Sequence, residues 1–66
     1  MSKTHKITLS EDELEILVDA LDADKEGYVE AAKEARGNNR RAEVATFTEA
    51  AERIEAVRGR LQALLD

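Results

Sequence analysis

After residue 10 the sequence has a single strong interruption of its helical pattern, and this interruption constrains the fold more than any other feature. It consists of Arg36, Gly37, Asn38 and Asn39, and proline is absent from the chain. A cation followed by glycine and asparagine is typical of a helix end and a turn, and we expect Gly37 to be the left-handed cap. The sequence therefore predicts two helices, over 11–36 and 40–65, each about 26 residues and about 39 Å long.

The start of the first helix is marked by a capping box. Ser10 and Glu13 have the S-x-x-E spacing in which each side chain bonds the backbone N–H of the other residue. Leu9 and Leu14 occupy the two positions of a hydrophobic staple around this cap. A helix that begins at Glu11 is the clearest local prediction.

Apolar residues in both predicted helices recur at alternating steps of three and four, which is the spacing of a seam between packed helices. In the first helix the seam is Leu14, Leu17, Leu21, Tyr28, Ala31 and Ala35, interrupted by Asp24. In the second it is Val44, Phe47, Ala51, Ile54, Leu61 and Leu65, with a parallel set at Ala50, Val57 and Leu64. Two helices of equal length joined by a short loop predict an antiparallel hairpin.

The hairpin predicts specific neighbours across the seam. Tyr28 is expected near Phe47, and Gly59 at a point where the helices approach closely. Asp24 is a candidate buried acid, but we favour two other interpretations: a shifted seam that admits the aliphatic stem of Lys25, or a pair between Asp24 and Arg53.

The hydrophobic residues are too few and too small for a large core. They are 42% of 66 residues, and 11 of them are alanine. Two helices form a single layer that cannot enclose a core, so we expect an all-α homodimer in the form of a four-helix bundle. The predicted oligomer interface is Leu14, Ile16, Leu17, Leu21, Tyr28, Phe47, Ile54, Val57, Leu61 and Leu64.

Residues 1–9 are predicted to be a tail, and residues 10–66 a single domain. Within the tail, Lys6-Ile7-Thr8-Leu9 alternates polar and apolar residues, which predicts a short extended strand. Cysteine is absent, which excludes disulfides and thiolate metal sites. No apolar run is long enough to span a membrane, and no signal peptide is apparent. We therefore expect a soluble cytoplasmic protein.

Negative charge is concentrated in the first helix. The net charge of the chain is −5, but residues 11–30 contain nine acids and one lysine, a local net charge of −8. We refer to Glu15, Asp19, Asp22, Glu26 and Glu30 as the acidic stripe. A solvated surface is the simplest interpretation of this stripe, and the functional alternative is a binding site for a basic protein partner.

Residues 22–33 resemble an EF-hand calcium loop, with acidic residues at loop positions one, three, five and nine: Asp22, Asp24, Glu26 and Glu30. Gly27 stands at position six. The sequence departs from the motif at position twelve, where Lys33 replaces the bidentate glutamate. The resemblance implies a degenerate calcium site, and an uninterrupted acidic helix is the favoured alternative.

The segment from Lys6 to Ser10, followed by two helices, resembles the ribbon-helix-helix DNA-binding proteins. This resemblance implies that Lys6 and Thr8 read bases and that Arg40 and Arg41 contact phosphate. The first helix is about twice the length that this fold uses, and its acidity opposes binding to nucleic acid.

No arrangement of nucleophile, base or metal ligands indicates an enzyme or a cofactor, because Ser10 serves as a cap and the single histidine, His5, lies in the tail. The chain as a whole, rich in Glu, Ala and Arg, resembles short helical proteins of bacteriophages and actinobacteria. That resemblance implies a phage accessory protein that acts on a host protein in the host cytoplasm. The function expected from the sequence is a non-catalytic, self-associating protein-interaction module.

Overall fold

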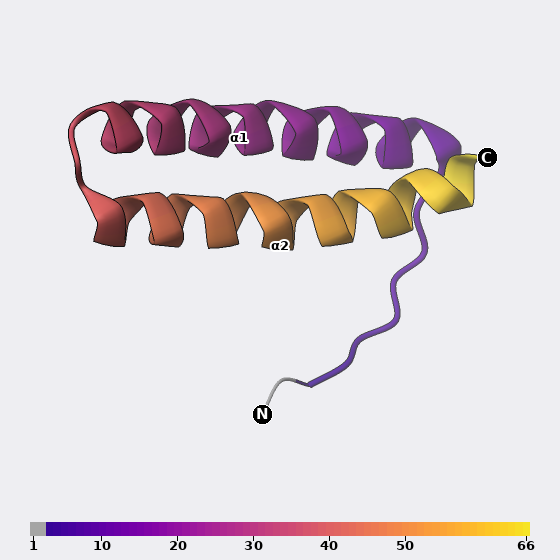
Figure 1. Ribbon diagram of the computed structural model, residues 1–66. Coiled ribbons are helices and arrows are strands. Elements are labelled where there is room, and N and C mark those ends of the chain that lie inside the picture. Colours follow the sequence, from indigo (N-terminus) through magenta and orange to yellow (C-terminus); the bar gives the residue numbers. More distant parts are fainter. Residues whose placement is uncertain (1–2) are drawn as a thin grey trace.

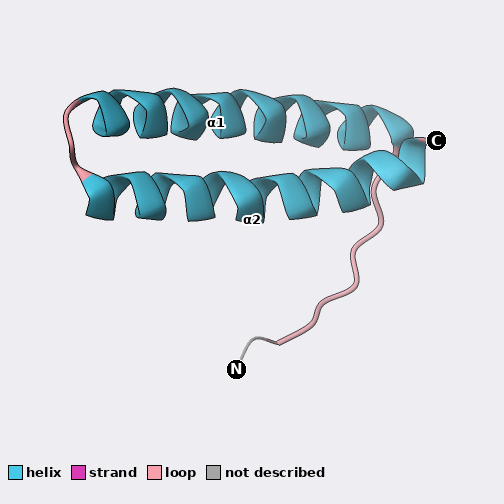
Figure 2. Cartoon of the chain, in the orientation of Figure 1, coloured by secondary structure: helices cyan, strands magenta, loops and turns pink. Residues whose placement is uncertain are grey.

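The computed structural model describes residues 3–66 as two helices packed side by side in an antiparallel hairpin (Figure 1). Helix α1 spans Glu11–Gly37 and helix α2 spans Arg41–Leu65. Residues 3–10 form neither helix nor strand and lead away from the hairpin (Figure 2). The two helices are confirmed to within one residue at each end. The strand expected in the tail is wrong for residues 3–9, and the first two residues lie outside the described range.

Helix α1 begins with the predicted capping box. Ser10 Oγ accepts a hydrogen bond from the Glu13 backbone N–H at 3.1 Å, and Glu13 Oε1 accepts one from the Ser10 N–H at 2.8 Å. Both backbone donors are therefore satisfied at a helix end where no preceding turn can accept from them.

The residue with a left-handed backbone at the end of α1 is an asparagine, whereas we expected a glycine. Gly37 is still helical, and the residue with a left-handed backbone is Asn39, at φ 61°. The amides of Asn38, Asn39 and Arg40 donate to the last carbonyls of α1, and Asn38 Nδ2 adds a bond of 3.0 Å to the Glu34 carbonyl. Asparagine tolerates the left-handed region, so the left-handed residue lies two positions later than predicted, while Asn38 and Asn39 form the turn as expected.

The contact between the helices is shifted around α1 relative to the predicted seam. Val18 is buried, with 6% of its surface exposed, whereas Leu17 is 39% exposed. Lys25 is partly buried, and Asp24 is exposed. We define the inner seam as the residues of α1 that turn toward α2: Leu14, Val18, Leu21, Lys25, Tyr28, Ala32 and Ala35. The shifted seam that admits Lys25 is thus confirmed, and Asp24 as a buried acid is wrong.

Alanine forms much of the tightest contact. The buried residues are Leu14, Val18, Ala32, Ala35 and Ala51, and Ala35 is the most buried, at 3% exposed. Tyr28 and Phe47 meet across the hairpin as predicted, with ring centroids 6.2 Å apart and the rings tilted by 38°. Larger side chains lie at the margins of this contact and keep part of their surface in solvent, as expected for a single layer.

Glycine at position 59 does not mark the close approach that the sequence suggested. A methyl group built on Gly59 would have no neighbouring atom within 4 Å, and the backbone is helical without a positive φ. The same holds for Gly27. Both glycines therefore weaken their helices without a packing benefit inside the hairpin.

We accordingly expect Gly59→Ala to stabilise the protein by about 0.5–1 kcal/mol, because alanine loses less backbone entropy than glycine on entering a helix. This should appear as a rise of several degrees in the midpoint of thermal unfolding followed by circular dichroism. An unchanged or lower midpoint would show that position 59 has a contact the hairpin does not reveal.

Candidate functional site: an open apolar face

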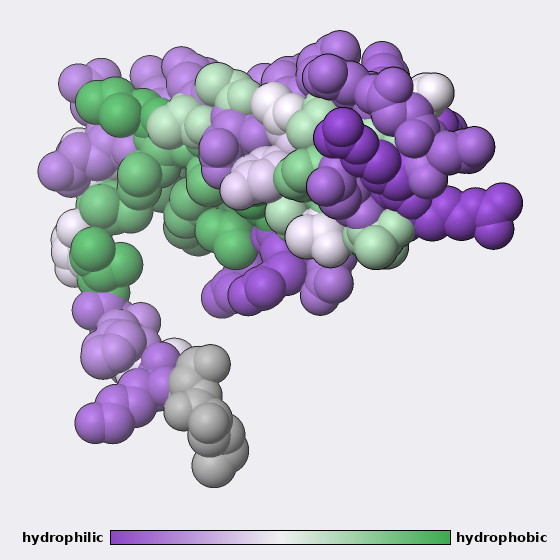
Figure 3. Space-filling model, turned by 90° about the vertical axis from the view of Figure 1, so that its left-hand side faces the viewer, coloured by the Kyte–Doolittle hydropathy of each residue, from purple (hydrophilic) through white to green (hydrophobic). Residues whose placement is uncertain are grey.

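One side of the hairpin carries apolar side chains that no part of residues 3–66 covers. A shallow groove between the helices is lined there by Leu21, Asp24, Tyr28, Ala50, Arg53, Ile54 and Val57, and it is continued along α2 by Arg60, Leu61 and Leu64. Figure 3, which looks at the hairpin from its loop end, shows hydrophobic surface gathered on one side and on the part of the tail nearest the hairpin. The opposite side is mainly hydrophilic in the same view.

The exposure of individual side chains supports this description. Val57 is 46% exposed and Leu64 is 70% exposed. We define the open face as Leu17, Leu21, Asp24, Tyr28 and Ala31 of α1 together with Phe47, Ala50, Ile54, Val57, Leu61 and Leu64 of α2. A helical hairpin that had evolved to remain single would be expected to place polar residues here, because contiguous exposed apolar patches mark interaction sites.

The spacing of the open face repeats that of the inner seam. On α2 its members alternate by three and four without exception, and on α1 they do the same from Leu17 to Ala31. Leu21 and Tyr28 of α1 belong to both the inner seam and the open face, and Phe47, Ile54 and Leu61 of the open face are themselves partly buried in the hairpin. Each helix therefore presents two adjacent helix-packing stripes, and the hairpin uses only one of them.

Most of the predicted oligomer interface lies on the open face, with two exceptions. Leu14 is buried in the inner seam, and Ile16 is 63% exposed. Ile16 precedes Leu17 by one residue, which places it about 100° around the helix from the open face. The interface predicted from the sequence omitted Asp24, although its position in the three-four spacing is visible in the sequence. It also omitted Arg53, which lines the groove at the margin of the open face and lies outside that spacing.

On the other side of the hairpin, ion pairs connect the two helices. Lys25 Nζ lies 3.3 Å from Glu55 Oε2, and Arg58 Nε lies 3.0 Å from Asp22 Oδ1. Arg58 Nε is buried and makes no hydrogen bond within the described residues, so its contact with Asp22 is an ion pair without hydrogen-bond alignment. These pairs join α1 to α2 along the edge opposite the open face.

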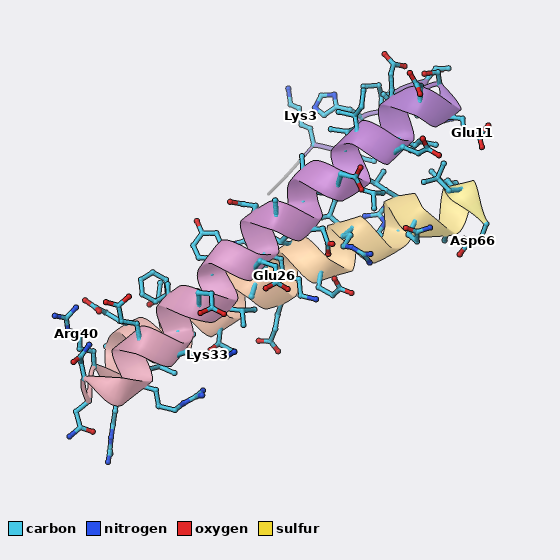
Figure 4. The ribbon with its side chains drawn as sticks, turned by 90° about the horizontal axis from the view of Figure 1, so that it is seen from above. Lys3, Glu11, Glu26, Lys33, Arg40 and Asp66 are labelled. Carbon is cyan, nitrogen blue, oxygen red and sulfur yellow. The ribbon has the colours of Figure 1, made fainter. Side chains whose placement is uncertain are left out.

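The acidic stripe lies along this charged edge and the outer surface of α1, and its members are exposed. In the view from above, Glu26 and Lys33 lie on the side of α1 opposite Lys3 (Figure 4). Asp22 is paired with Arg58, and Glu30 Oε1 lies 3.6 Å from Lys33 Nζ. The remaining three carboxylates have no ion pair with residues 3–66.

The residues of the EF-hand resemblance do not form a loop. Residues 22–33 are helical throughout, which spreads Asp22, Asp24, Glu26 and Glu30 along a rigid rod. Within residues 3–66 no three acidic or histidine side chains are close enough to hold one metal ion. The uninterrupted acidic helix that we favoured is therefore confirmed, and the loop geometry implied by the EF-hand resemblance is wrong.

The residues of the DNA-binding resemblance are not brought together within one hairpin. Lys6 and Thr8 lie before α1 at the open end of the hairpin, whereas Arg40 and Arg41 lie at the loop end (Figure 1). All four are exposed. About 40 Å of helix separates the two pairs, and within the described part of the tail Lys6 and Thr8 do not lie in a strand.

Comparison with protein families, with characterised proteins and with solved structures finds no match to this chain. Neither helix is long and apolar enough to cross a membrane, within the part of the chain that the structure describes.

Proposed function

We propose that this protein is a non-catalytic protein-interaction module that works as a homodimer. The main support for the proposal is the open face. A hairpin that worked as a monomer would not need a second apolar stripe on each helix. Two hairpins that pack these faces together would form a four-helix bundle and bury the large side chains that a single layer leaves wet.

The area of the face is adequate for such a dimer. Two helices lying side by side, each about 10 Å across and about 37 Å long, present roughly 750 Å². Each partner in a standard protein–protein interface buries about 800 Å². Light scattering at micromolar concentration is expected to give twice the mass of the chain, and a mass of one chain would contradict the dimer.

The acidic stripe is the surface proposed for a basic protein partner, because a dimer formed through the open face leaves it in solvent. Electrostatic complementarity of this kind steers association and selects partners. The resemblance to phage accessory proteins suggests a host protein as that partner, in the cytoplasm of the host.

This second part of the proposal is tested with Asp19→Lys combined with Glu26→Lys, which reverses two stripe charges that make no ion pair within residues 3–66. The variant is expected to remain dimeric but to lose at least tenfold in affinity for the partner isolated with the wild-type protein. The matched control is Glu49→Lys with Glu52→Lys on α2. Equal loss in both variants would assign the effect to net charge and would contradict a role for the stripe.

A further inference from the structure

Asp24 and Arg53 are the two charged residues among those that line the central part of the groove on the open face, and Arg60 lines its continuation along α2. Both are exposed, and neither has an ion pair of 4 Å or shorter with residues 3–66. A charged side chain that becomes buried in an interface destabilises the complex unless it pairs with an opposite charge. Asp24 and Arg53 would therefore destabilise any complex that covers the groove without pairing them. Their positions therefore restrict which surfaces can bind over the groove.

Two hairpins can meet through their open faces in two ways that keep all neighbouring helices antiparallel. If the two loops lie at opposite ends of the bundle, α1 faces α1 of the second copy and α2 faces α2. If the two loops lie at the same end, α1 faces α2 of the second copy. The two arrangements differ in which side chains lie at the same level along the bundle.

The level of each residue follows from contacts within the hairpin. Tyr28 is level with Phe47, Lys25 with Glu55, and Asp22 with Arg58. Extending the two ion-paired levels along the helices places Leu17 within about one residue of the level of Leu64, and Ala31 within about one residue of that of Ala50. Asp24 lies about one helical turn from the level of Arg53, and both side chains line the same groove. Two hairpins related by a two-fold axis along the bundle would preserve these levels between copies.

With the loops at the same end, each of these positions meets a complementary one on the second copy. Leucine meets leucine, alanine meets alanine, and Asp24 meets Arg53. With the loops at opposite ends, Asp24 meets Asp24 and Arg53 meets Arg53 near the centre of the interface. Like charges placed together in a desolvated interface cost several kcal/mol.

The distribution of charge over the whole helices favours the same arrangement. Residues 11–30 of α1 have a net charge of −8, whereas residues 34–66 contain six acids and six arginines. Loops at opposite ends would pack the two acidic helices against each other. Loops at the same end separate them on a diagonal, so that each α1 has a balanced α2 on both sides.

We infer that the protein pairs with a second copy of itself with both loops at the same end of the bundle, so that Asp24 of each chain faces Arg53 of the other. This inference rests on the proposed dimer and specifies its pairing. In this pairing Asp24 and Arg53 determine the relative orientation of the two hairpins. The apolar side chains around them contribute the binding free energy of the dimer.

The test exchanges the two charges in one chain, Asp24→Arg with Arg53→Asp. The exchanged chain can pair with itself in the inferred arrangement, because each arginine again meets an aspartate. A dimer of one exchanged and one wild-type chain would instead oppose Asp24 to the new aspartate and Arg53 to the new arginine. In the opposite arrangement the preference is reversed, and the mixed dimer is the one without like-charge contacts.

The exchange does not change the mass of the chain, so the wild-type protein is labelled with ¹⁵N, mixed with an equal amount of unlabelled exchanged chain, unfolded, refolded and measured by native mass spectrometry. We expect mixed dimers to be at least fivefold fewer than in a control mixture of labelled and unlabelled wild type. Mixed dimers at or above the control level would overturn the inferred pairing while leaving the dimer intact. Single chains in the control would overturn the dimer itself.

A second measurement does not depend on the folding of the exchanged chain. Because the protein has no cysteine, Leu17→Cys and Leu64→Cys can be introduced in separate chains at exposed positions of the open face. In an oxidised mixture of the two, we expect crosslinks between unlike chains to exceed those between like chains at least fivefold. Crosslinks no more frequent between unlike than between like chains would contradict the inferred pairing.

Discussion

Replacement of Ala51 by aspartate is expected to unfold most of the protein at room temperature. Ala51 is the one buried residue of α2, and together with Val29 and Ala32 it lines a second groove between the helices, on the side away from the open face. An aspartate there would be an ionised group in an apolar contact, with Glu52 and Glu55 nearby. Of the cations that line this groove, Lys25 is already paired with Glu55 at 3.3 Å and Lys33 with Glu30 at 3.6 Å, and Arg36 lies toward the loop.

The size of the effect follows from the size of the protein. A buried polar group without partners costs about 1–3 kcal/mol, and a charged one costs more. A domain of fewer than 70 residues rarely has more than about 3–5 kcal/mol of stability in total. The helical circular dichroism signal of the variant should therefore fall toward that of an unfolded chain.

The matched control is Ala56→Asp, which makes the same chemical change at an exposed position of the same helix. It should lower stability only by the difference in helix propensity, about 0.5 kcal/mol. If the two variants unfold at the same temperature, the packing of α1 against Ala51 is not what holds the hairpin together.

Replacement of Val57 by glutamate is expected to convert the proposed dimer into single chains. Val57 lies on the open face and is 46% exposed in the hairpin, so a glutamate can remain solvated there without disturbing the inner seam. In a dimer the same residue would be covered, and the two-fold symmetry would bury two added carboxylates among the apolar side chains of one interface. Several kcal/mol of dimer stability would be lost.

Light scattering at micromolar concentration is the direct measurement, and the mass is expected to fall by half. The unfolding temperature should also stop depending on protein concentration, because that dependence comes from association. Ile16→Glu is the matched control: Ile16 is 63% exposed and lies away from the open face. Retention of the dimer in Val57→Glu, or its loss in Ile16→Glu, would mean that another surface joins the two chains.

The Ile16→Glu measurement also decides whether Ile16 belongs to the oligomer interface, as the sequence predicted, or lies outside it, as the structure indicates. The sequence alone placed Ile16 in the oligomer interface because it is large and apolar. The position of the inner seam places it outside both packing stripes of α1. A residue of this kind is common on protein surfaces and needs no partner.

Several features of this protein can be predicted from its sequence alone. The start of α1 follows from Ser10 and Glu13, whose hydrogen bonds depend only on residues three apart. The loop follows from a run of poor helix formers in a chain without proline. The hairpin and the contact between Tyr28 and Phe47 follow from two helices of matched length.

Other features depended on the tertiary structure, because the apolar stripe of each helix is wider than one contact. Successive residues of a helix are 100° apart, so a small rotation of α1 replaces Leu17, which the sequence placed against α2, with Val18. The hairpin buries Val18 and the stem of Lys25, where pairing with Glu55 satisfies the amine. Leu17 and Asp24 are consequently left on the open face. The sequence thus determined that each helix has an apolar side, and only the packing of α1 on α2 decided which half of that side remains available to a second chain.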